Sequence, residues 1–157
     1  MKKSFIGIIS LILVIACFAG CGSKKAVDID ILDITESTFL SQITEIYNDP
    51  SSYIGKTIKI EGIFKEDKHN GHSHYYVYRN APVYDPDHGH EHIQQIGFEF
   101  EYNKSLPKEN DWIEVLGILR IYTENGNAVL RLEDNNIKIL NVRGAETIGD
   151  IEAVHNH

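Results

Sequence analysis

The stretch Asp111-Trp112-Ile113-Glu114-Val115-Leu116-Gly117-Ile118-Leu119-Arg120-Ile121-Tyr122 decides the fold. Its β-branched and aromatic residues favour a long strand, and Gly117 stands where such a strand would bend in a small barrel. The next residues, 124–127, contain an Asn-Gly pair, which reaches positive φ at little cost and therefore predicts a hairpin turn. Residues 128–132 and 137–140 return from that turn, so this part of the chain is predicted to form an antiparallel hairpin.

Three segments before this hairpin also carry strand signals, either apolar residues at every second position or clustered aromatic and β-branched residues: 53–64, 74–78 and 96–102. Ahead of them, residues 37–47 place apolar side chains at helical spacing. This pattern stops before Pro50, because proline disfavours helix at the residue that precedes it. The sequence therefore predicts one short helix followed by five strands.

A resemblance supports this architecture. The pattern Tyr53-x-Gly55-Lys56-x-Ile58-x-Ile60-x-Gly62, followed by Asp111–Leu119, is similar to oligonucleotide/oligosaccharide-binding (OB) barrels of the tRNA-anticodon-binding-like type. It also resembles small Gram-positive lipoproteins that carry such a barrel and have no assigned function. The resemblance covers about residues 38–140. It implies a mainly β fold, a five-stranded OB-like Greek-key barrel preceded by one short helix.

The N-terminus has the features of an export signal. Two lysines, Lys2 and Lys3, precede an apolar run over residues 5–18, which is shorter than the ~20 residues that span a bilayer. The run ends in Phe18-Ala19-Gly20-Cys21, which resembles the lipobox of bacterial lipoprotein precursors. That resemblance implies cleavage before Cys21, acylation of its thiol, and anchoring of the chain by lipid to the extracytoplasmic face of the cell membrane. The segment ending at Cys17 fits the pattern loosely and remains an alternative.

These signals divide the chain into a signal peptide (1–20), a tether (21–37), a barrel domain (38–140) and a polar, histidine-containing tail (141–157). Loss of the signal peptide changes the formal charge from −8 to −10, which disfavours nucleic acid as a partner. Both cysteines precede residue 22, so the domain has no disulfide framework. It also has no nucleophile-elbow motif and no phosphate-binding loop, so we expect no enzymatic activity.

Histidine is the unusual residue, because six of the eight fall within 24 positions. Two loops between strands are predicted to hold them, and each places imidazoles two residues apart, where an extended backbone directs them to one side. Neutral imidazole is a ligand for zinc, copper and nickel, and nearby carboxylates either bind the ion or orient the rings. The predicted ligands are His88, His90 and His92, with His69, His72 and His74 as a second cluster or additional ligands, and Asp85, Asp87 and Glu91 as auxiliary groups.

The sequence thus predicts a lipid-anchored domain that binds zinc or another divalent transition metal, for buffering or for delivery to a metal transporter. The alternative is a non-catalytic interaction or ligand-binding module at the cell envelope, with an envelope protein as partner and with incidental histidines. Whether the two histidine clusters form one site stays open at this point.

Overall fold

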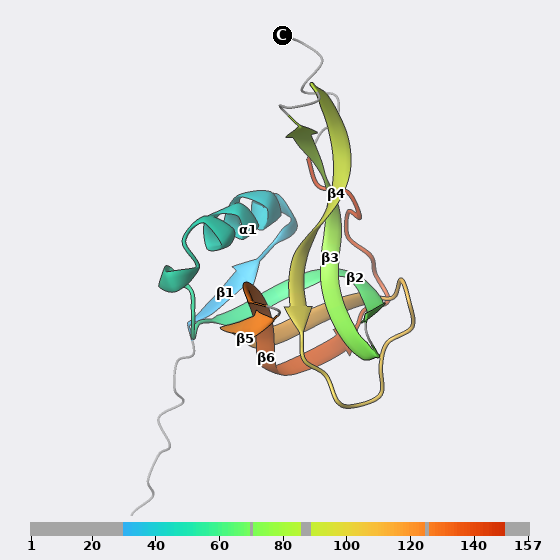
Figure 1. Cartoon of the computed structure of the whole chain (residues 1–157). Helices are drawn as coiled ribbons and strands as arrows, with labels where there is room; N and C mark the ends of the chain where they lie inside the picture. The colour runs from blue at the N-terminus through green and yellow to red at the C-terminus, as the bar shows by residue number, and fades with distance from the viewer. Residues whose placement is uncertain (1–29, 70, 86–88, 125, 150–157) are drawn as a thin grey trace, which may run out of the picture.

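The computed structural model describes residues 30–69, 71–85, 89–124 and 126–149 (Figure 1). The described part consists of strands with one short α-helix and two 3₁₀ turns. The elements, in chain order, are β1 (Ile31–Ile34), η1 (Glu36–Thr38), α1 (Phe39–Asn48), η2 (Pro50–Ser52), β2 (Thr57–His69), β3 (His72–Asp85), β4 (His90–Phe100), β5 (Trp112–Glu124) and β6 (Asn127–Ile139). The mainly β fold with a short helix is therefore confirmed.

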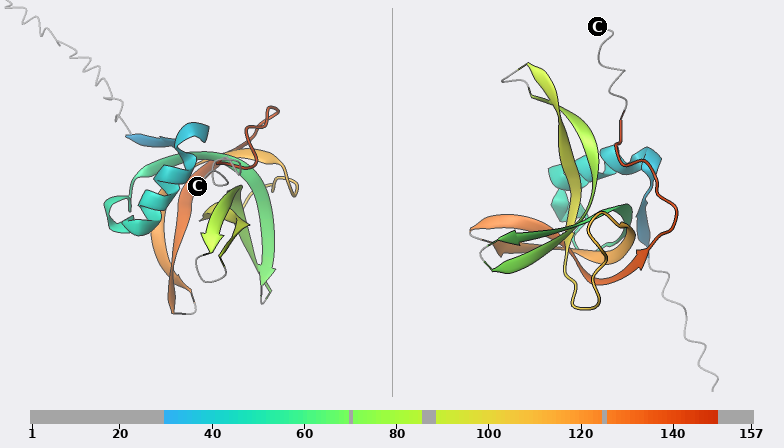
Figure 2. Two further views of the ribbon diagram at one scale, coloured as in Figure 1. Left: turned by 90° about the horizontal axis from the view of Figure 1, so that it is seen from above. Right: turned by 90° about the vertical axis from the view of Figure 1, so that its right-hand side faces the viewer.

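The strands form one mixed sheet in the order β1-β2-β3-β4-β6-β5, and β5 also pairs with β2. Hydrogen-bonded pairing therefore runs from β2 through four other strands and back to β2. The pairs β1–β2 and β4–β6 are parallel, whereas the other pairs are antiparallel. Figure 2 shows the sheet curving around the core from two further directions. Apolar residues at alternate positions of β2 and β5 face inward, as in Ile58, Ile60 and Val115, which are fully buried.

The predicted number of five strands is wrong, because β1 adds a sixth. It pairs in parallel with the start of β2, Ile34 is buried in the core, and the Lys59 Nζ lies 2.5 Å from an oxygen of Asp33. Part of the segment predicted as a tether therefore belongs to the folded domain. The sequence did not indicate this strand, because Asp30 and Asp33 flank and interrupt its apolar residues and an alternating pattern over only four residues is weak.

One hydrophobic core joins the sheet to the helix. The helix contributes the buried side chains of Phe39, Ile43 and Ile46, which recur at helical spacing on one face. They pack with buried residues from all six strands and from the C-terminal segment; the strand and C-terminal members are Ile34, Ile58, Ile60, Phe64, Val77, Phe98, Phe100, Ile113, Val115, Leu119, Leu130, Leu132 and Ile148. The helix thus lies against the sheet as the sequence pattern predicts, and the C-terminal segment completes the core.

A buried arginine ties the two ends of the domain together. Arg79, on β3, is 2% exposed and lies between the rings of Phe39 and Trp112. Its Nε donates to the Glu61 carbonyl at 2.8 Å, and one terminal nitrogen donates to the Ala145 carbonyl at 3.2 Å. Residues 145–148 also bond to the β3 backbone at Asn80. The segment predicted as a polar tail is thus held against the sheet as far as it is described.

The histidine segments were predicted as loops but form the ends of long hairpins. β2 and β3 pair as far as His69 and His72, and β3 and β4 pair as far as Asp85 and His90. The β3–β4 hairpin projects beyond the rest of the sheet (Figures 1 and 2). Where a hairpin projects, water reaches both of its faces, so the apolar alternation that marks a strand is lost even though the backbone pairing continues.

Among the described residues, no helix has the length and apolar character needed to cross a membrane. The predicted signal peptide, Cys17 and Cys21 lie outside the described residues, as do Asp87, His88 and the C-terminal residues 150–157.

Candidate functional site

The β2–β3 hairpin gathers three of the predicted ligands on one face. In its register His69 is opposite His72, and Asp67 is opposite His74. Directly paired residues of an antiparallel sheet lie on the same face, and so do residues two apart on one strand. His69, His72, His74 and Asp67 therefore share one face, and all except His74 are exposed.

His74 is fixed by a carboxylate that the sequence did not single out. Its Nδ1 lies 3.1 Å from one oxygen of Glu99, and the hydroxyl of Tyr122 donates to the other oxygen at 2.6 Å. Glu99, on β4, is 7% exposed, and each of its two oxygens has a hydrogen-bond partner within the protein. The second ring nitrogen of His74, Nε2, lies 3.7 Å from a carboxylate oxygen of Glu124 at the end of β5.

His74, Glu99, Tyr122 and Glu124 form one cluster, and its electrostatics affect the pKa of Tyr122. Burial and the hydrogen bond to Glu99 raise the pKa of the Tyr122 phenol above its ordinary value of 10.0. Arg131 lies over the Tyr122 ring, 4.2 Å from its centroid, and opposes that increase in pKa. The phenol therefore keeps its proton at neutral pH and remains a donor to Glu99.

The β3–β4 hairpin holds the other predicted cluster at the opposite end of β3. His90 and His92 lie two apart on β4, so they share a face, with His90 opposite Asp85 and His92 opposite Val83. His92 is exposed, and Glu91 is half-buried on the other face. Because β3 runs between the two hairpin ends, the described histidines lie in two separate groups, one at each end of that strand (Figure 1).

No three donors from His, Cys, Asp or Glu converge within the described residues. The β2–β3 face thus carries the ligand types at neighbouring positions, and the imidazole of His74 lies near two carboxylates, Glu99 at 3.1 Å and Glu124 at 3.7 Å.

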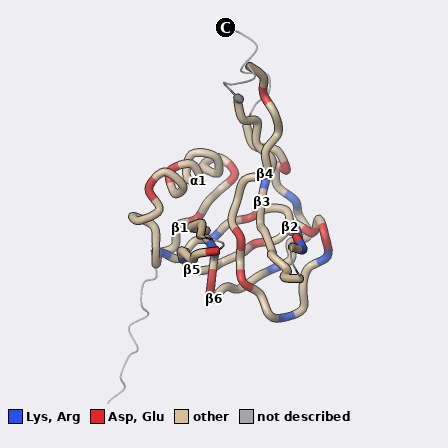
Figure 3. The backbone as a smooth tube through the Cα atoms, in the orientation of Figure 1, with Lys and Arg blue, Asp and Glu red and all other residues tan. Residues whose placement is uncertain are grey.

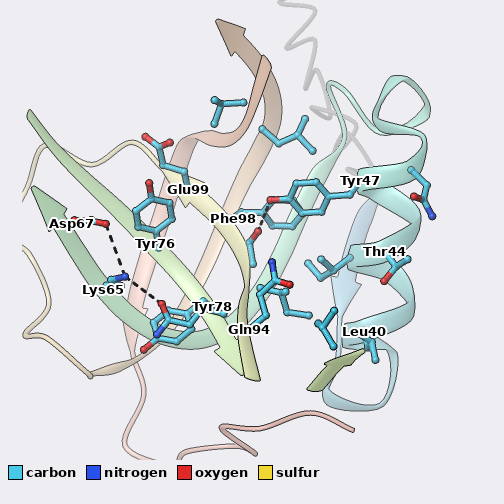
Figure 4. Close-up of a pocket in the computed structure, with 18 of the residues that line it drawn as sticks. Leu40, Thr44, Tyr47, Lys65, Asp67, Tyr76, Tyr78, Gln94, Phe98 and Glu99 are labelled. Atoms are coloured by element: carbon cyan, nitrogen blue, oxygen red, sulfur yellow. Dashed lines mark hydrogen bonds and ion pairs between the residues drawn. The ribbon is translucent and has the colours of Figure 1, made fainter. Parts of the chain in front are cut away.

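A groove of about 650 Å³ opens beside this cluster. It lies between α1, the strands β2 to β4 and the β5–β6 hairpin, and Figure 4 shows Tyr47 and Thr44 of α1 across from Tyr76 and Glu99. Tyr47 stacks on Phe98, with ring centroids 5.8 Å apart, and donates a hydrogen bond to the Gly97 carbonyl at 2.8 Å. Asp67, Glu99 and Glu124 line the groove, whereas His74 itself is not among its lining residues.

Charge in the groove is mainly acidic. Lys65 is the one Lys or Arg among its lining residues that the structure describes, and it lies between Asp67, at 4.0 Å, and the amide oxygen of Gln95, at 3.2 Å. Elsewhere in the described chain, Lys and Arg are interspersed with Asp and Glu (Figure 3).

Sequence reasoning missed Glu99, Tyr122, Glu124 and the groove. Glu99 and Tyr122 occupy ordinary positions of alternating strands, where a polar residue normally faces water. The contacts of Glu99 with His74 and with Tyr122 each join residues more than twenty positions apart, and no local pattern carries that information.

Comparison with known proteins gives one family. The model described as DUF1980 C-terminal domain matches residues 22–150. No curated protein and no solved structure matches the chain.

Proposed function

We propose that this chain, which belongs to the DUF1980 C-terminal domain family, binds zinc or another divalent transition metal through its histidine hairpins. The family description names no activity, so the proposal rests on the residues. The observation that carries it is the register of β2 and β3, which brings His69, His72 and His74 to one face beside Asp67. Imidazole and carboxylate are the donors from which zinc sites without cysteine are built.

The role proposed is binding rather than catalysis. The β2–β3 face is open to water, since His69, His72 and Asp67 are exposed, which suits an ion that is taken up and released. A catalytic zinc site would instead hold a preformed set of three protein ligands beside an enclosed pocket. Buffering, or delivery to a metal transporter, follows from such a reversible site. His90 and His92 of the second hairpin, with His88, which lies outside the described residues, remain candidate ligands of a separate site.

Zinc titration of the full chain, purified in mild detergent without an affinity tag, tests the proposal. Isothermal calorimetry is expected to give micromolar or tighter binding, and the triple change of His69, His72 and His74 to alanine is expected to weaken it by more than about tenfold. A second variant changes His90 and His92 to alanine and measures the contribution of the other hairpin. Undetectable binding to the unaltered chain, or binding that neither variant weakens, would contradict the proposal.

The location proposed is the extracytoplasmic face of the cell membrane, with Cys21 as the acylated residue. The supporting features are the basic and apolar N-terminal segments and the small residues before that cysteine. Labelled palmitate is expected to be incorporated into the chain in cells and to be lost in Cys21→Ser. Incorporation that persists in Cys21→Ser and is lost in Cys17→Ser would assign the lipid to Cys17.

The groove favours a second candidate function, that of an OB-type barrel which binds an organic ligand. The closed pairing of β2, β3, β4, β6 and β5 supports this barrel type, and Tyr47, Tyr76 and Tyr78 supply aromatic rings along the groove. Its acidic lining disfavours phosphate-bearing ligands such as nucleic acid. Ligand-observed NMR with neutral oligosaccharides and peptides tests this function, and Tyr76→Ala is expected to abolish any signal of binding.

A further inference from the structure

The imidazole of His74 is held in one orientation by a buried carboxylate, Glu99. With a proton on Nδ1 of His74, that nitrogen donates to Glu99 at 3.1 Å, and Nε2 is left with a lone pair. Metal-binding histidines in proteins are commonly held in this way, by a carboxylate on the nitrogen that does not touch the ion. The second oxygen of Glu99 is occupied by the Tyr122 hydroxyl, so the Glu99 carboxylate is fixed from both sides.

In that tautomer the Nε2 lone pair of His74 faces the carboxylate of Glu124, with Nε2 3.7 Å from one of its oxygens. Such a contact becomes favourable when a cation, either a proton on Nε2 or a metal ion, lies between the two atoms. Two ligands of a tetrahedral zinc ion, each about 2.1 Å from it, stand about 3.4 Å apart. The observed separation is therefore close to that of two ligands of one ion, and Glu124, with a side chain 40% exposed, has room to adjust.

We propose that His74 and Glu124 form the primary pair of metal ligands, and that Glu99 is the positioning residue that orients His74. This inference rests on the proposed metal-binding function and specifies its site. It places the ion between the β2–β3 hairpin and the end of β5, rather than at the hairpin tip alone. Asp67, opposite His74 in the register, and His72, two residues away on the same strand, supply further donors on the same face.

The site also has an entrance. Glu124, Glu99 and Asp67 belong to the lining of the groove, and His74 is 16% exposed. An ion bound to Glu124 is reached from the groove through that residue, since His74 itself does not line the groove, while the oxygens of Glu99 stay engaged with His74 and Tyr122. Because those two oxygens already accept hydrogen bonds, Glu99 acts through the imidazole and does not itself bind the ion.

Zinc titration of the full chain with single carboxamide variants tests the site. Glu124→Gln removes a ligand charge at a half-exposed position, and we expect zinc affinity to fall by about tenfold or more. Glu99→Gln is expected to weaken binding by about 10–100-fold, the usual effect of losing such an orienting carboxylate. The matched control is Glu101→Gln, which makes the same change in charge two residues from Glu99, where the side chain is 65% exposed.

A spectroscopic readout separates positioning from general stability. The ¹⁵N shifts of the His74 ring are expected to show the proton on Nδ1 before zinc is added and a metal-dependent shift at Nε2 afterwards. In Glu99→Gln the proton is expected to redistribute between the two nitrogens while the single tryptophan, Trp112, keeps its native fluorescence.

The outcomes distinguish this inference from the function on which it rests. If the triple histidine variant loses zinc and Glu124→Gln does not, the function stands and the proposed ligand pair is wrong. If Glu124→Gln binds more weakly and Glu99→Gln binds as tightly as the unaltered chain, the positioning role is wrong. If the unaltered chain binds no zinc, both proposals fall.

Discussion

Replacing Arg79 with alanine is expected to lower the free energy of unfolding by about 3–5 kcal/mol, because the change removes two buried hydrogen bonds, two cation–π contacts and the packing of the side chain. Arg79 is 2% exposed, and its guanidinium lies 5.0 Å from the Phe39 ring centroid and 4.8 Å from that of Trp112. It also donates to the main-chain carbonyls of Glu61 and Ala145. Few side chains in this fold connect as many distant segments.

The expected loss of stability is the sum of the contacts that Arg79→Ala removes. Each carbonyl that loses a buried donor costs about 1–1.5 kcal/mol, and each cation–π contact contributes about 0.5–1 kcal/mol. The ion pair with Glu36, whose side chain is 57% exposed, adds little because water screens it. Lost packing of the aliphatic stem adds about 0.8 kcal/mol per methylene, and relief of the buried charge offsets part of the total.

Urea denaturation measures this change, with Trp112 fluorescence and far-ultraviolet circular dichroism as independent probes. At a slope of about 1.5 kcal/mol per molar urea, the midpoint is expected to fall by about 2–3 M. Amide exchange at Ile148, whose N–H donates to the Asn80 carbonyl, is expected to accelerate as the C-terminal segment loosens.

Two matched variants complete the test. Arg120→Ala removes an exposed arginine from β5 and is expected to change the free energy of unfolding by less than about 0.5 kcal/mol. Arg79→Lys keeps the positive charge but not the planar guanidinium. Its free energy of unfolding is therefore expected to lie between those of Arg79→Ala and Arg120→Ala. A loss below about 1 kcal/mol in Arg79→Ala, or a loss equal to that of Arg120→Ala, would refute the reasoning.

Three further predictions concern the same fold. Ile34→Ala is expected to lower the free energy of unfolding by about 2–4 kcal/mol in urea denaturation, because the Ile34 side chain is buried in the core; an unchanged free energy would show that β1 does not contribute to the folded domain. Gly97→Ala is expected to cost about 3 kcal/mol, since a Cβ there would lie 2.8 Å from the Tyr78 Cα, whereas Gly89→Ala, which meets only the strain of positive φ, is expected to cost about 1 kcal/mol; equal midpoints would contradict this. Because the pKa of Tyr122 is raised in the folded state, the unfolded chain loses that proton first, so stability is expected to fall as pH rises above about 10; Tyr122→Phe is expected to reduce the fall, and unchanged slopes would exclude the cause.

The sequence predicted the elements that depend on local pattern. The helix around Phe39, Ile43 and Ile46 followed from apolar spacing, and the β5–β6 hairpin followed from its Asn-Gly turn. The histidine spacing of two also carried real information, because a strand does place such residues on one face. These features extend over a few residues, so neighbouring side chains are enough to specify them.

The ends of the hairpins and β1 were not predictable in the same way. Exposed paired strands lack the apolar alternation by which a strand is recognised, so the histidine segments were assigned to loops. The four residues of β1 are too few for their pattern to stand out.

By itself, the sequence determined the type of each long element and which of its faces is apolar, since both follow from the period of the side chains along the backbone. Only the tertiary structure decided which strand pairs with which, and with that the surroundings of His74. The β3–β4 pairing places Glu99 beside His74. The parallel pairing of β4 with β6 and the return of β5 to β2 join distant segments, so that Tyr122 reaches Glu99 and Glu124 reaches the imidazole. Alternating apolar residues show which face of a strand is buried, but they do not show which strand lies beside it. The hydrophobic effect is non-directional, so the neighbouring strand depends on how the whole core packs.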